Sequence, residues 1–285
     1  MVANGLIYRQ HRPVYYSPSS RSALAEAELE YNDHVSESAY VPFDLDTECK
    51  PCHPDLVEVL SKGIVIKFLI WTTTPWTLTA NMGIAVHEDL HYDLLSDGKV
   101  AYLVSSVRVE AVSKILNVDR TVKLASLPGK HAQFPTCSYL KLMSIGKALI
   151  GLQYKPLFQK PKFPKSFEII HAPHVTSDAG TGLVHLAPAH GAEDYNAFRI
   201  WGFLSTPKPG SNLLCHVDDK GHFSPDVAEV VGEEEALSLI GRDVLYSGSK
   251  NILRLLKKWQ RLVGTERITH KYPYDWRTKK PVIVT

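Results

Sequence analysis

Long apolar runs are missing from this sequence of 285 residues. A membrane-spanning helix needs about 18 consecutive apolar residues, and no segment approaches that length. The first residues, which include Asn4, Arg9 and Arg12, also lack the apolar core of a secretory signal peptide. Both absences predict a soluble protein without a membrane partner.

The sequence also lacks an excess of charge of either sign. It has 32 Lys and Arg and 30 Asp and Glu, which gives a net charge of +2. Any nucleic-acid contact is therefore expected from local clusters, such as residues 155–165 or Arg277, Lys279 and Lys280. The aromatic residues of 270–277 either stack on bases or form a packed corner. A hydrophobic content of 44% is ordinary for a globular chain of one or two domains.

Cysteine is scarce, with four residues. Cys49 and Cys52, followed by His53, match the C-x-x-C-H pattern of covalent haem attachment. Haem attachment requires export, for which the sequence has no signal, so a plain surface loop is favoured over a metal clip and over haem. Cys137 and Cys215 are isolated, and we expect reduced thiols in an intracellular compartment and no cofactor.

Apolar periodicity and turn residues predict the main elements. Residues 64–71 are β-branched, aromatic and nearly all apolar, which is typical of a buried strand. Further strands are expected at 35–45, 82–86, 100–104 and 167–172, a hairpin within 205–232, and helices at 51–62, 107–116, 194–201 and 249–262. Residues 22–31 fit either a helix or a strand. The apolar face of the last helix is interpreted as core packing.

The two ends of the chain resemble each other. Residues 12–17 and 280–285 both run from basic residues through a proline into β-formers. Two such runs suggest strands that pair and bring the termini together, as an inserted domain requires in order to rejoin its host. The alternative is that they are unrelated edge strands.

Residues 180–195 carry the strongest candidate site. Glycines allow a tight turn, an apolar strand follows, and a proline-containing loop then presents polar side chains, with His185, His190 and Asp194 the notable ones. Three interpretations stay open: a core strand with capping residues, a metal site, and an organic hydrolytic site in which Asp194 anchors a positive group. Pro188 keeps the two histidines from sharing a helix face, which disfavours metal, and no Lys-Ser/Thr pair follows the glycines, which disfavours a phosphate loop.

A second candidate segment follows the buried strand at 64–71. Thr72, Thr73 and Thr74 place hydroxyl groups on both faces of the chain, and Pro75 ends the strand pairing next to Trp76. Threonine in a strand usually needs no functional explanation. Hydroxyl groups gathered at the end of a buried strand are nevertheless typical of a pocket wall.

Taken together, WTTTPWTLTAN at 71–81 and GTGLVHLAPAHGAEDY at 180–195 resemble the two signature segments of the editing domain inserted into class I isoleucyl-tRNA synthetases. RPVYYSPSSRSALAEAELEY near the start and HKYPYDWRTKKPV near the end resemble the segments that join this insert to its Rossmann host. The resemblance implies an α/β fold, a β-barrel-like editing domain with surrounding helices and paired terminal strands. It implies one domain over 1–285, with strand linkers toward the synthetase core at 1–20 and 275–285 and the editing barrel at 35–272.

The resemblance also implies an activity. H-x-G-H and K-M-S-K-S elements are absent, so we expect no activation of isoleucine. The implied reaction is hydrolysis of valine wrongly attached to tRNA(Ile), at the 3′ end, with valyl-adenylate as a possible second substrate and without a metal or cofactor. A site for isoleucine excludes a ligand one methylene smaller by only about 1 to 3 kcal/mol, a magnitude known for this enzyme family rather than derived from this chain.

Two alternatives are kept, a non-catalytic insert that binds the tRNA 3′ end and a metal-dependent hydrolase. The implied partner is the rest of the synthetase in cis, and the chain is expected to be a monomer. The Ser-Pro-Ser-Ser and ALAEAELEYN segments resemble the mitochondrial branch, which implies the mitochondrial matrix, or the cytoplasm if the protein is bacterial.

Residue roles are carried over from the resemblance. Asp194 is expected to bind the α-ammonium of the aminoacyl group, and His185 to form a wall that fits valine and clashes with the extra methyl of isoleucine. The opposite wall, which positions the terminal ribose and water, is assigned to Thr72, Thr73, Thr74 and Trp76. Support or ribose contacts are assigned to Thr77 and Asn81, and the shape of the loop to His190 and Gly191. The usual proline of the family is Thr79 here, and no nucleophile has an adjacent base, which suits an ester attacked by positioned water.

Overall fold

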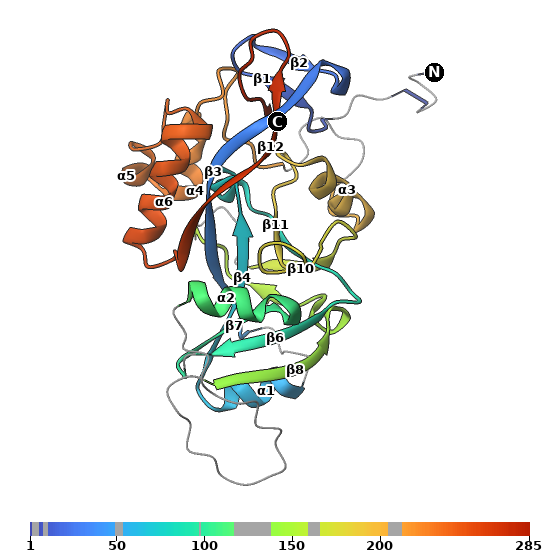
Figure 1. Ribbon diagram of the computed structural model, residues 1–285, viewed down its shortest axis with the longest axis vertical. Coiled ribbons are helices and arrows are strands. Elements are labelled where there is room, and N and C mark those ends of the chain that lie inside the picture. The colour runs from blue at the N-terminus through green and yellow to red at the C-terminus, as the bar shows by residue number, and fades with distance from the viewer. Residues whose placement is uncertain are drawn as a thin grey trace.

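The computed structural model describes residues 1, 6–7, 11–48, 54–96, 98–116, 138–158, 166–204 and 213–285. Within these ranges the strands form three sheets, and helices cover their sides (Figure 1). None of the helices in the described ranges combines the length and hydropathy needed to cross a bilayer. The C-x-x-C-H segment and Cys137 lie outside the described residues, and Cys215 is an exposed free thiol.

The largest sheet has the order β12-β3-β4-β7-β6-β8. Its strands are β3 (Leu29–Asp44), β4 (Val65–Thr72), β6 (His91–Ser96), β7 (Val100–Ser105), β8 (Ser138–Ile145) and β12 (Gly264–Asp275). The apolar strand predicted at 64–71 is β4, which lies between β3 and the parallel strand β7. A central strand is covered on both faces, which explains why it is apolar almost throughout. Toward its N-terminus, β3 leaves this core and forms a long antiparallel ribbon with β12.

Two smaller sheets complete the fold. The first, in the order β11-β5-β10-β9, contains β5 (Gly83–Val86), β9 (Gln153–Tyr154), β10 (Phe167–His171) and β11 (Val184–Leu186). The second joins β1 (Tyr15–Ser17) and β2 (Ser22–Leu24) to β13 (Ile283–Val284). Tyr15 pairs with Val284, so the predicted pairing of the terminal strands is confirmed. The described strands form open sheets rather than one closed barrel.

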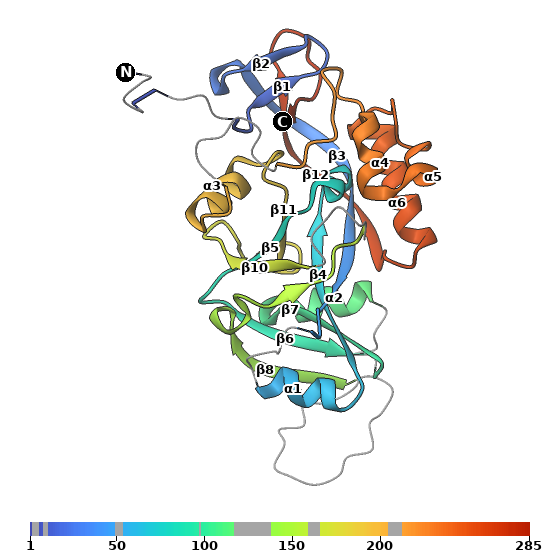
Figure 2. The same cartoon turned by 180° about the vertical axis from the view of Figure 1, so that it is seen from behind.

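Helices lie on several sides of the sheets. They are α1 (Pro54–Ser61), α2 (Val109–Ile115), α3 (Ala192–Ile200), α4 (Ala228–Val231), α5 (Glu233–Ala236) and α6 (Ser249–Lys258). Short turns are η1 (Glu26–Glu28), η2 (Pro75–Ala80), η3 (Ser106–Arg108), η4 (Gly146–Leu149), η5 (Pro225–Val227) and the π-turn η6 (Val244–Gly248). Figures 1 and 2 show α4, α5 and α6 together on the side of β3 and β12, with α3 on the other side.

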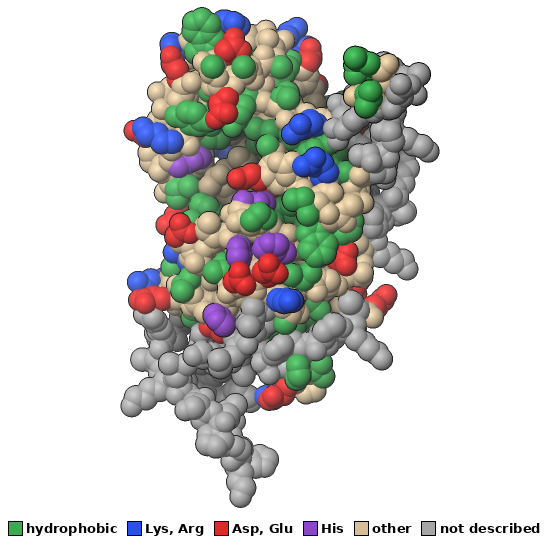
Figure 3. All heavy atoms as spheres, turned by 90° about the vertical axis from the view of Figure 1, so that its right-hand side faces the viewer, with side chains coloured by type: hydrophobic (Ala, Val, Ile, Leu, Met, Phe, Trp, Pro, Cys, Tyr) green, Lys and Arg blue, Asp and Glu red, His purple; other side chains and the backbone are tan. Residues whose placement is uncertain are grey.

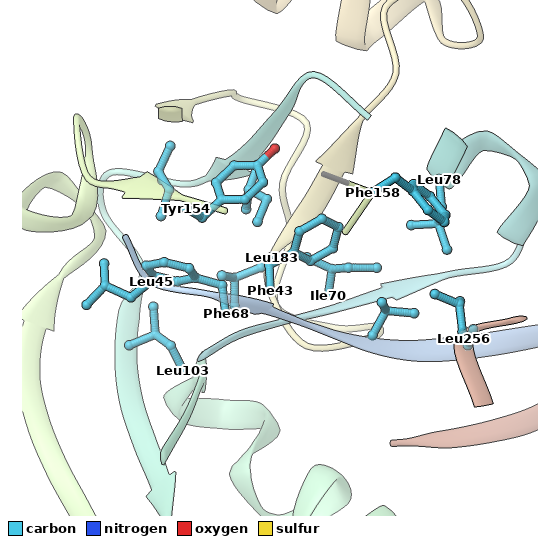
Figure 4. Close-up of a cluster of buried hydrophobic side chains, with 14 of the residues drawn as sticks. Phe43, Leu45, Phe68, Ile70, Leu78, Leu103, Tyr154, Phe158, Leu183 and Leu256 are labelled. Carbon is cyan, nitrogen blue, oxygen red and sulfur yellow. The ribbon is translucent and has the colours of Figure 1, made fainter. Parts of the chain in front are cut away.

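The principal core lies between the sheets (Figure 4). Phe43 and Phe68, from neighbouring strands β3 and β4, are fully buried, and Tyr154 packs edge-on against Phe43 with 5.2 Å between ring centroids. Burial of each such aromatic ring contributes about 2 to 3 kcal/mol. Leu78 of η2 and Leu256 of α6 belong to the same core, so the turn after β4 is fixed by packing.

Most predicted elements are confirmed, and some details are corrected. Residues 22–31 contain strand β2, turn η1 and the start of β3. The predicted hairpin within 205–232 is found as a bridge between Val217 and Phe223, but the segment that follows is helical, as η5, α4 and α5. Strand β6 was not predicted. Most of the aromatic segment before Arg277 belongs to β12, where the Tyr272 hydroxyl donates to the carbonyl of Val282 (3.0 Å), whereas Trp276 lies beyond the strand and is exposed.

Candidate functional site

The threonines after β4 form a hydrogen-bonded turn. Thr72 ends the strand, and its Oγ1 accepts the backbone N–H of Thr74 (3.1 Å). Pro75 begins η2, where the missing N–H costs nothing because the first N–H groups of a helical turn have no internal partner. Thr73 is half-buried between them. The hydroxyl groups predicted to line a wall are therefore held at the end of a rigid strand.

The glycines of the second segment allow a close approach to β4 and β7. Gly180 and Gly182 both have left-handed backbone, with φ of +61° and +77°. A Cβ atom on Gly180 would lie 2.8 Å from the Trp71 ring, and one on Gly182 would lie 2.3 Å from Cβ of Ser105. Arg108 Nε donates to the carbonyl of Gly180 (2.9 Å). The glycines thus serve to bring β11 against the end of β4.

His185, on β11, meets the threonine turn directly. Its Nε2 lies 3.0 Å from Thr77 Oγ1, whose single proton is donated to the carbonyl of Thr74 (2.8 Å). Thr77 Oγ1 can then only accept, so His185 carries its proton on Nε2 and presents a bare Nδ1. Within the described residues this buried Nδ1 has no hydrogen-bond partner. Burial, reinforced by the neighbouring His190, lowers the pKa of His185 to about 4, which keeps the ring neutral at pH 7.

His190 links the site loop to the C-terminal strand. Its Nδ1 lies 2.9 Å from the carbonyl of Val284, so Nδ1 is the protonated nitrogen. The ring stands edge-on to the indole of Trp76, with 4.6 Å between centroids. Burial lowers the pKa of His190 to about 4, against the opposing effect of the Val284 hydrogen bond. Its contacts are thus to the backbone and to Trp76, and its role in shaping the loop stays a prediction.

Asp194 lies in the first turn of α3 with its two oxygens in different environments. Oδ2 accepts the backbone N–H of Ala187 (2.9 Å), and Oδ1 lies 3.6 Å from Nε2 of His174. Gly191 leaves room for this arrangement, because a Cβ atom there would lie 3.0 Å from the carboxylate. Burial raises the pKa of Asp194, while the Ala187 hydrogen bond and His174 act in the opposite direction. Oδ1 is the oxygen available to a cation.

A family model described as tRNA synthetases class I (I, L, M and V) matches residues 1–264 of this chain. The chain belongs to this family. The isoleucine–tRNA ligase of Cyanothece sp. is 38% identical over 285 residues, that of Bacillus licheniformis 36% over 284, and the mitochondrial one of Macaca fascicularis 36% over 288. These alignments cover 99% or 100% of the chain but only 25% of each relative. The chain therefore spans about a quarter of the length of the synthetases that it matches.

Solved structures of synthetase fragments have the same fold. The crystal structure of GlLeuRS-CP1 superposes with a TM-score of 0.54 at 11% identity, covering 79% of this chain and 97% of that one. The editing domain of the P. knowlesi cytosolic leucyl-tRNA synthetase gives 0.51 at 12% identity, covering 82% and 96%. At these identities the likeness concerns the fold. The predicted α/β editing-domain fold of the class I synthetases is thus confirmed.

Two further residues, Asn81 and Thr79, support the turn. The amide of Asn81 is hydrogen-bonded at both ends, because its nitrogen donates to the carbonyl of Gly83 (2.9 Å) and its oxygen accepts from the hydroxyl of Tyr154 (2.7 Å). Both bonds hold the end of the turn against β5 and β9. Thr79 stands where the editing domains that this chain resembles usually have a proline. Its hydroxyl donates to the carbonyl of Trp76 (3.1 Å) and so keeps the turn closed.

Sequence reasoning missed two histidines. His174 faces Asp194, and His216 is 5% exposed with neither ring nitrogen hydrogen-bonded within the described residues. Burial lowers the pKa of His216, and its charge would in turn disfavour protonation of His190. Both lie in loops without a periodic pattern, so only their residue type could have drawn attention. No group of three or more His, Cys, Asp or Glu in the described residues is arranged to hold a metal ion.

Proposed function

We propose that this chain hydrolyses valine from mischarged tRNA(Ile) as the editing part of an isoleucyl-tRNA synthetase, with valyl-adenylate as a second substrate. The observation that carries the proposal is the hydrogen bond between Thr77 and His185, because it joins the two signature segments at one place. The family match and the editing-domain fold support it. The nearby Asp194 supplies a carboxylate oxygen for a charged amine.

In this proposal the α-ammonium of the valyl group binds Oδ1 of Asp194, since Oδ2 already accepts the N–H of Ala187. A charge-assisted hydrogen bond of this kind is about twice as strong as a neutral one. The neutral ring of His185 forms the size-limiting wall. Its position is fixed by Thr77, so the ring cannot turn aside for a larger side chain.

The reaction is ester hydrolysis by a positioned water molecule. The water oxygen bonds to the carbonyl carbon, the bond from this carbon to the ribose oxygen breaks, and a water proton passes to the ribose oxygen. The products are valine and tRNA with a free terminal hydroxyl group. An ester is reactive enough that positioning supplies much of the rate. We assign positioning of the ribose and the water to Thr72, Thr73 and Thr74, together with Trp76.

The direct test compares valyl-tRNA(Ile) and isoleucyl-tRNA(Ile) as substrates of the purified chain. We expect the valyl ester to decay faster by one to two orders of magnitude, the range that one methylene supports. Equal decay of the two esters would remove the selectivity. Binding without turnover would support the rival insert that only holds the tRNA 3′ end, and activity lost on chelation would support a metal-dependent hydrolase.

The rest of the synthetase in cis, a monomeric state and the cellular location belong to the same proposal. The mitochondrial relative from Macaca fascicularis and the bacterial one from Bacillus licheniformis are both 36% identical to this chain. Equal identity does not favour either location. The mitochondrial matrix thus stays a prediction drawn from the N-terminal segments alone.

A further inference from the structure

A groove of about 490 Å³ lies between α6 and the start of β12, away from the residues of the candidate site. Both ribbon views place α6 beside β12 and β3 (Figures 1 and 2). Its cationic lining comes from α6 and consists of Lys250, Arg254 and Lys257. The other lining residues are Leu253, Leu262, Val263, Gly264, Thr265 and Glu37. The groove therefore has positive walls and a partly apolar floor.

The three cations belong to one face of the helix. Lys250, Arg254 and Lys257 are four and three residues apart, a spacing that puts side chains on the same side of a helix. All three are exposed. On its other side α6 buries Ile252, Leu255 and Leu256 in the core, as its apolar pattern predicted. One face of α6 therefore packs in the core, and another carries exposed positive charge.

The positive charge of the groove is not balanced within it. Among the described residues, no carboxylate lies within ion-pair distance of Lys250 or Lys257, and Arg254 donates only to the neutral amide of Asn251 (2.7 Å). Lys258, outside the groove, has a carboxylate partner in Glu235. The one acidic lining residue, Glu37, lies opposite Arg267 in the β3–β12 register. An anionic partner would therefore be attracted.

We propose that this groove holds the sugar-phosphate backbone of tRNA. Regularly spaced cations match the repeated charges of a phosphodiester chain, and the leucine and valine floor suits sugar and base faces. The position fits as well, because α6 packs against η2, which carries Trp76 and Thr77. RNA on the outer face of α6 would lie about one helix diameter, 10 to 12 Å, from that turn. The inference rests on the proposed function and names its RNA-binding surface.

The test is tRNA(Ile) binding to the full chain, measured by fluorescence anisotropy at 50 to 200 mM salt. The groove variant combines Lys250→Ala, Arg254→Ala and Lys257→Ala. The matched control combines Lys62→Ala, Lys114→Ala and Lys271→Ala, which removes the same charge from exposed, ion-paired sites outside the groove. Loss of three phosphate contacts should reduce the slope of the logarithm of the binding constant against the logarithm of salt concentration by about 2 to 3. The factor by which affinity falls between 50 and 200 mM salt should therefore be about 20 to 40 times smaller in the groove variant than in the wild-type chain. Glu37→Gln should tighten binding.

The outcomes separate this inference from the proposed function. If the groove variant binds with the affinity and salt slope of the wild-type chain, if the control loses as much, or if the wild-type chain does not bind, the inference is overturned. Hydrolysis of the valyl ester of adenosine, which is too small to reach the groove, should be unchanged in the groove variant. Failure of the wild-type chain to hydrolyse that small ester would count against the proposed function alone. Circular dichroism checks that both variants are folded.

Discussion

Asp194 is the residue in which function and stability oppose each other. Burial raises its pKa, so the folded chain holds a proton there more tightly than the unfolded chain does. Stability therefore falls as the pH rises through the interval between the ordinary value of 3.8 and the raised one, and the cost is present wherever the carboxylate is ionised. Asp194→Asn keeps an oxygen for the N–H of Ala187 and removes the charge. We expect a higher melting temperature at pH 7 and a deacylation rate about 10- to 100-fold lower.

Two comparisons control this experiment. Asp194→Ala removes the acceptor as well and leaves the N–H of Ala187 unpaired, so it should lose deacylation without the gain in melting temperature. Below the ordinary pKa, the melting temperatures of Asp194→Asn and the wild-type chain should converge. Wild-type deacylation by either variant would show that another group holds the ammonium.

The size limit is predicted to depend on His185. His185→Ala should admit isoleucyl-tRNA(Ile) and reduce the preference for the valyl ester by about 10- to 200-fold, the range that one methylene supports. Thr77→Val tests the support of the ring, because it keeps the shape of Thr77 but removes the oxygen that accepts from Nε2. It should lose part of the preference. Continued rejection of isoleucine by His185→Ala would assign the limit to another wall.

At the scale of single residues, the sequence indicated the candidate site through its two motifs, and it missed the residues that contact them from elsewhere. Thr77, His185 and Asp194 are adjacent to glycine, proline and strand signals that mark them. His174 and His216 come from loops whose contacts depend on how distant segments meet, such as the 3.6 Å approach of His174 to Asp194. Local patterns carry no information about such an approach.

Among the elements, the turn from Gly180 to Gly182 is the one that sets the geometry of the site. Gly182→Ala would place a Cβ atom 2.3 Å from Cβ of Ser105 in a backbone with φ of +77°. Gly63→Ala is the matched control, because Gly63 has φ of +76° and open space around it. Both substitutions should cost about 1 to 2 kcal/mol for the left-handed backbone. Gly182→Ala should cost about 1 to 3 kcal/mol more for overpacking, measured by urea unfolding.

The activity of these two variants gives a second measurement. Gly182→Ala should also reduce deacylation, because the start of β11 would move away from Ser105 at the end of β7 and strain the contact between His185 and Thr77. Gly63→Ala should leave deacylation unchanged. Equal losses of stability in both variants would show that Ser105 can move away from the added methyl group at little cost in free energy.

Prediction succeeded for elements with strong local patterns. Strand β4 is apolar except for Lys67 and the terminal Thr72, and α6 has a regular apolar stripe, so both were found. Strand β6 begins with His91, Tyr92 and Asp93, a polar start that hides a buried strand, since Asp93 is 1% exposed. The helical turns after Ser224 were missed because Pro225 and the nearby aspartates favour a loop in isolation.

For the whole molecule, the paired ends follow from two short runs of similar composition, whereas the arrangement of the sheets does not. Tyr15 and Val284 pair across nearly the full length of the chain. The organisation of the strands into three open sheets depends on pairings such as β5 with β10 and β11, whose members are far apart in sequence. Strand composition fixes which faces are buried but leaves the choice of partner open.

Acid stability is the prediction that belongs to the whole molecule. Burial lowers the pKa of both His185 and His190 from 6.5 to about 4, so the unfolded chain takes up these protons first. Stability from the two neutral rings is therefore complete above pH 6.5 and is lost as the pH falls toward about 4. Asp275 titrates at lower pH, because hydrogen bonds from Ser17, Arg277 and other neighbours hold its pKa at about 2 against the opposing effect of burial. Its contribution to stability is therefore lost only below the pH range of the two histidines. Urea unfolding at pH 7, 6, 5 and 4 should show the decline.

A non-titrating variant assigns this decline to the site. His190→Gln keeps a donor for the carbonyl of Val284 but takes up no proton, so it should flatten the fall in unfolding free energy between pH 6.5 and 4. His91→Gln, at an exposed position on β6, is the control and should preserve the wild-type curve. Because Asp194 acts with the opposite sign in part of this interval, Asp194→Asn should make the decline steeper. A wild-type chain whose unfolding free energy is constant from pH 6.5 to 4 would show that these imidazoles stay hydrated.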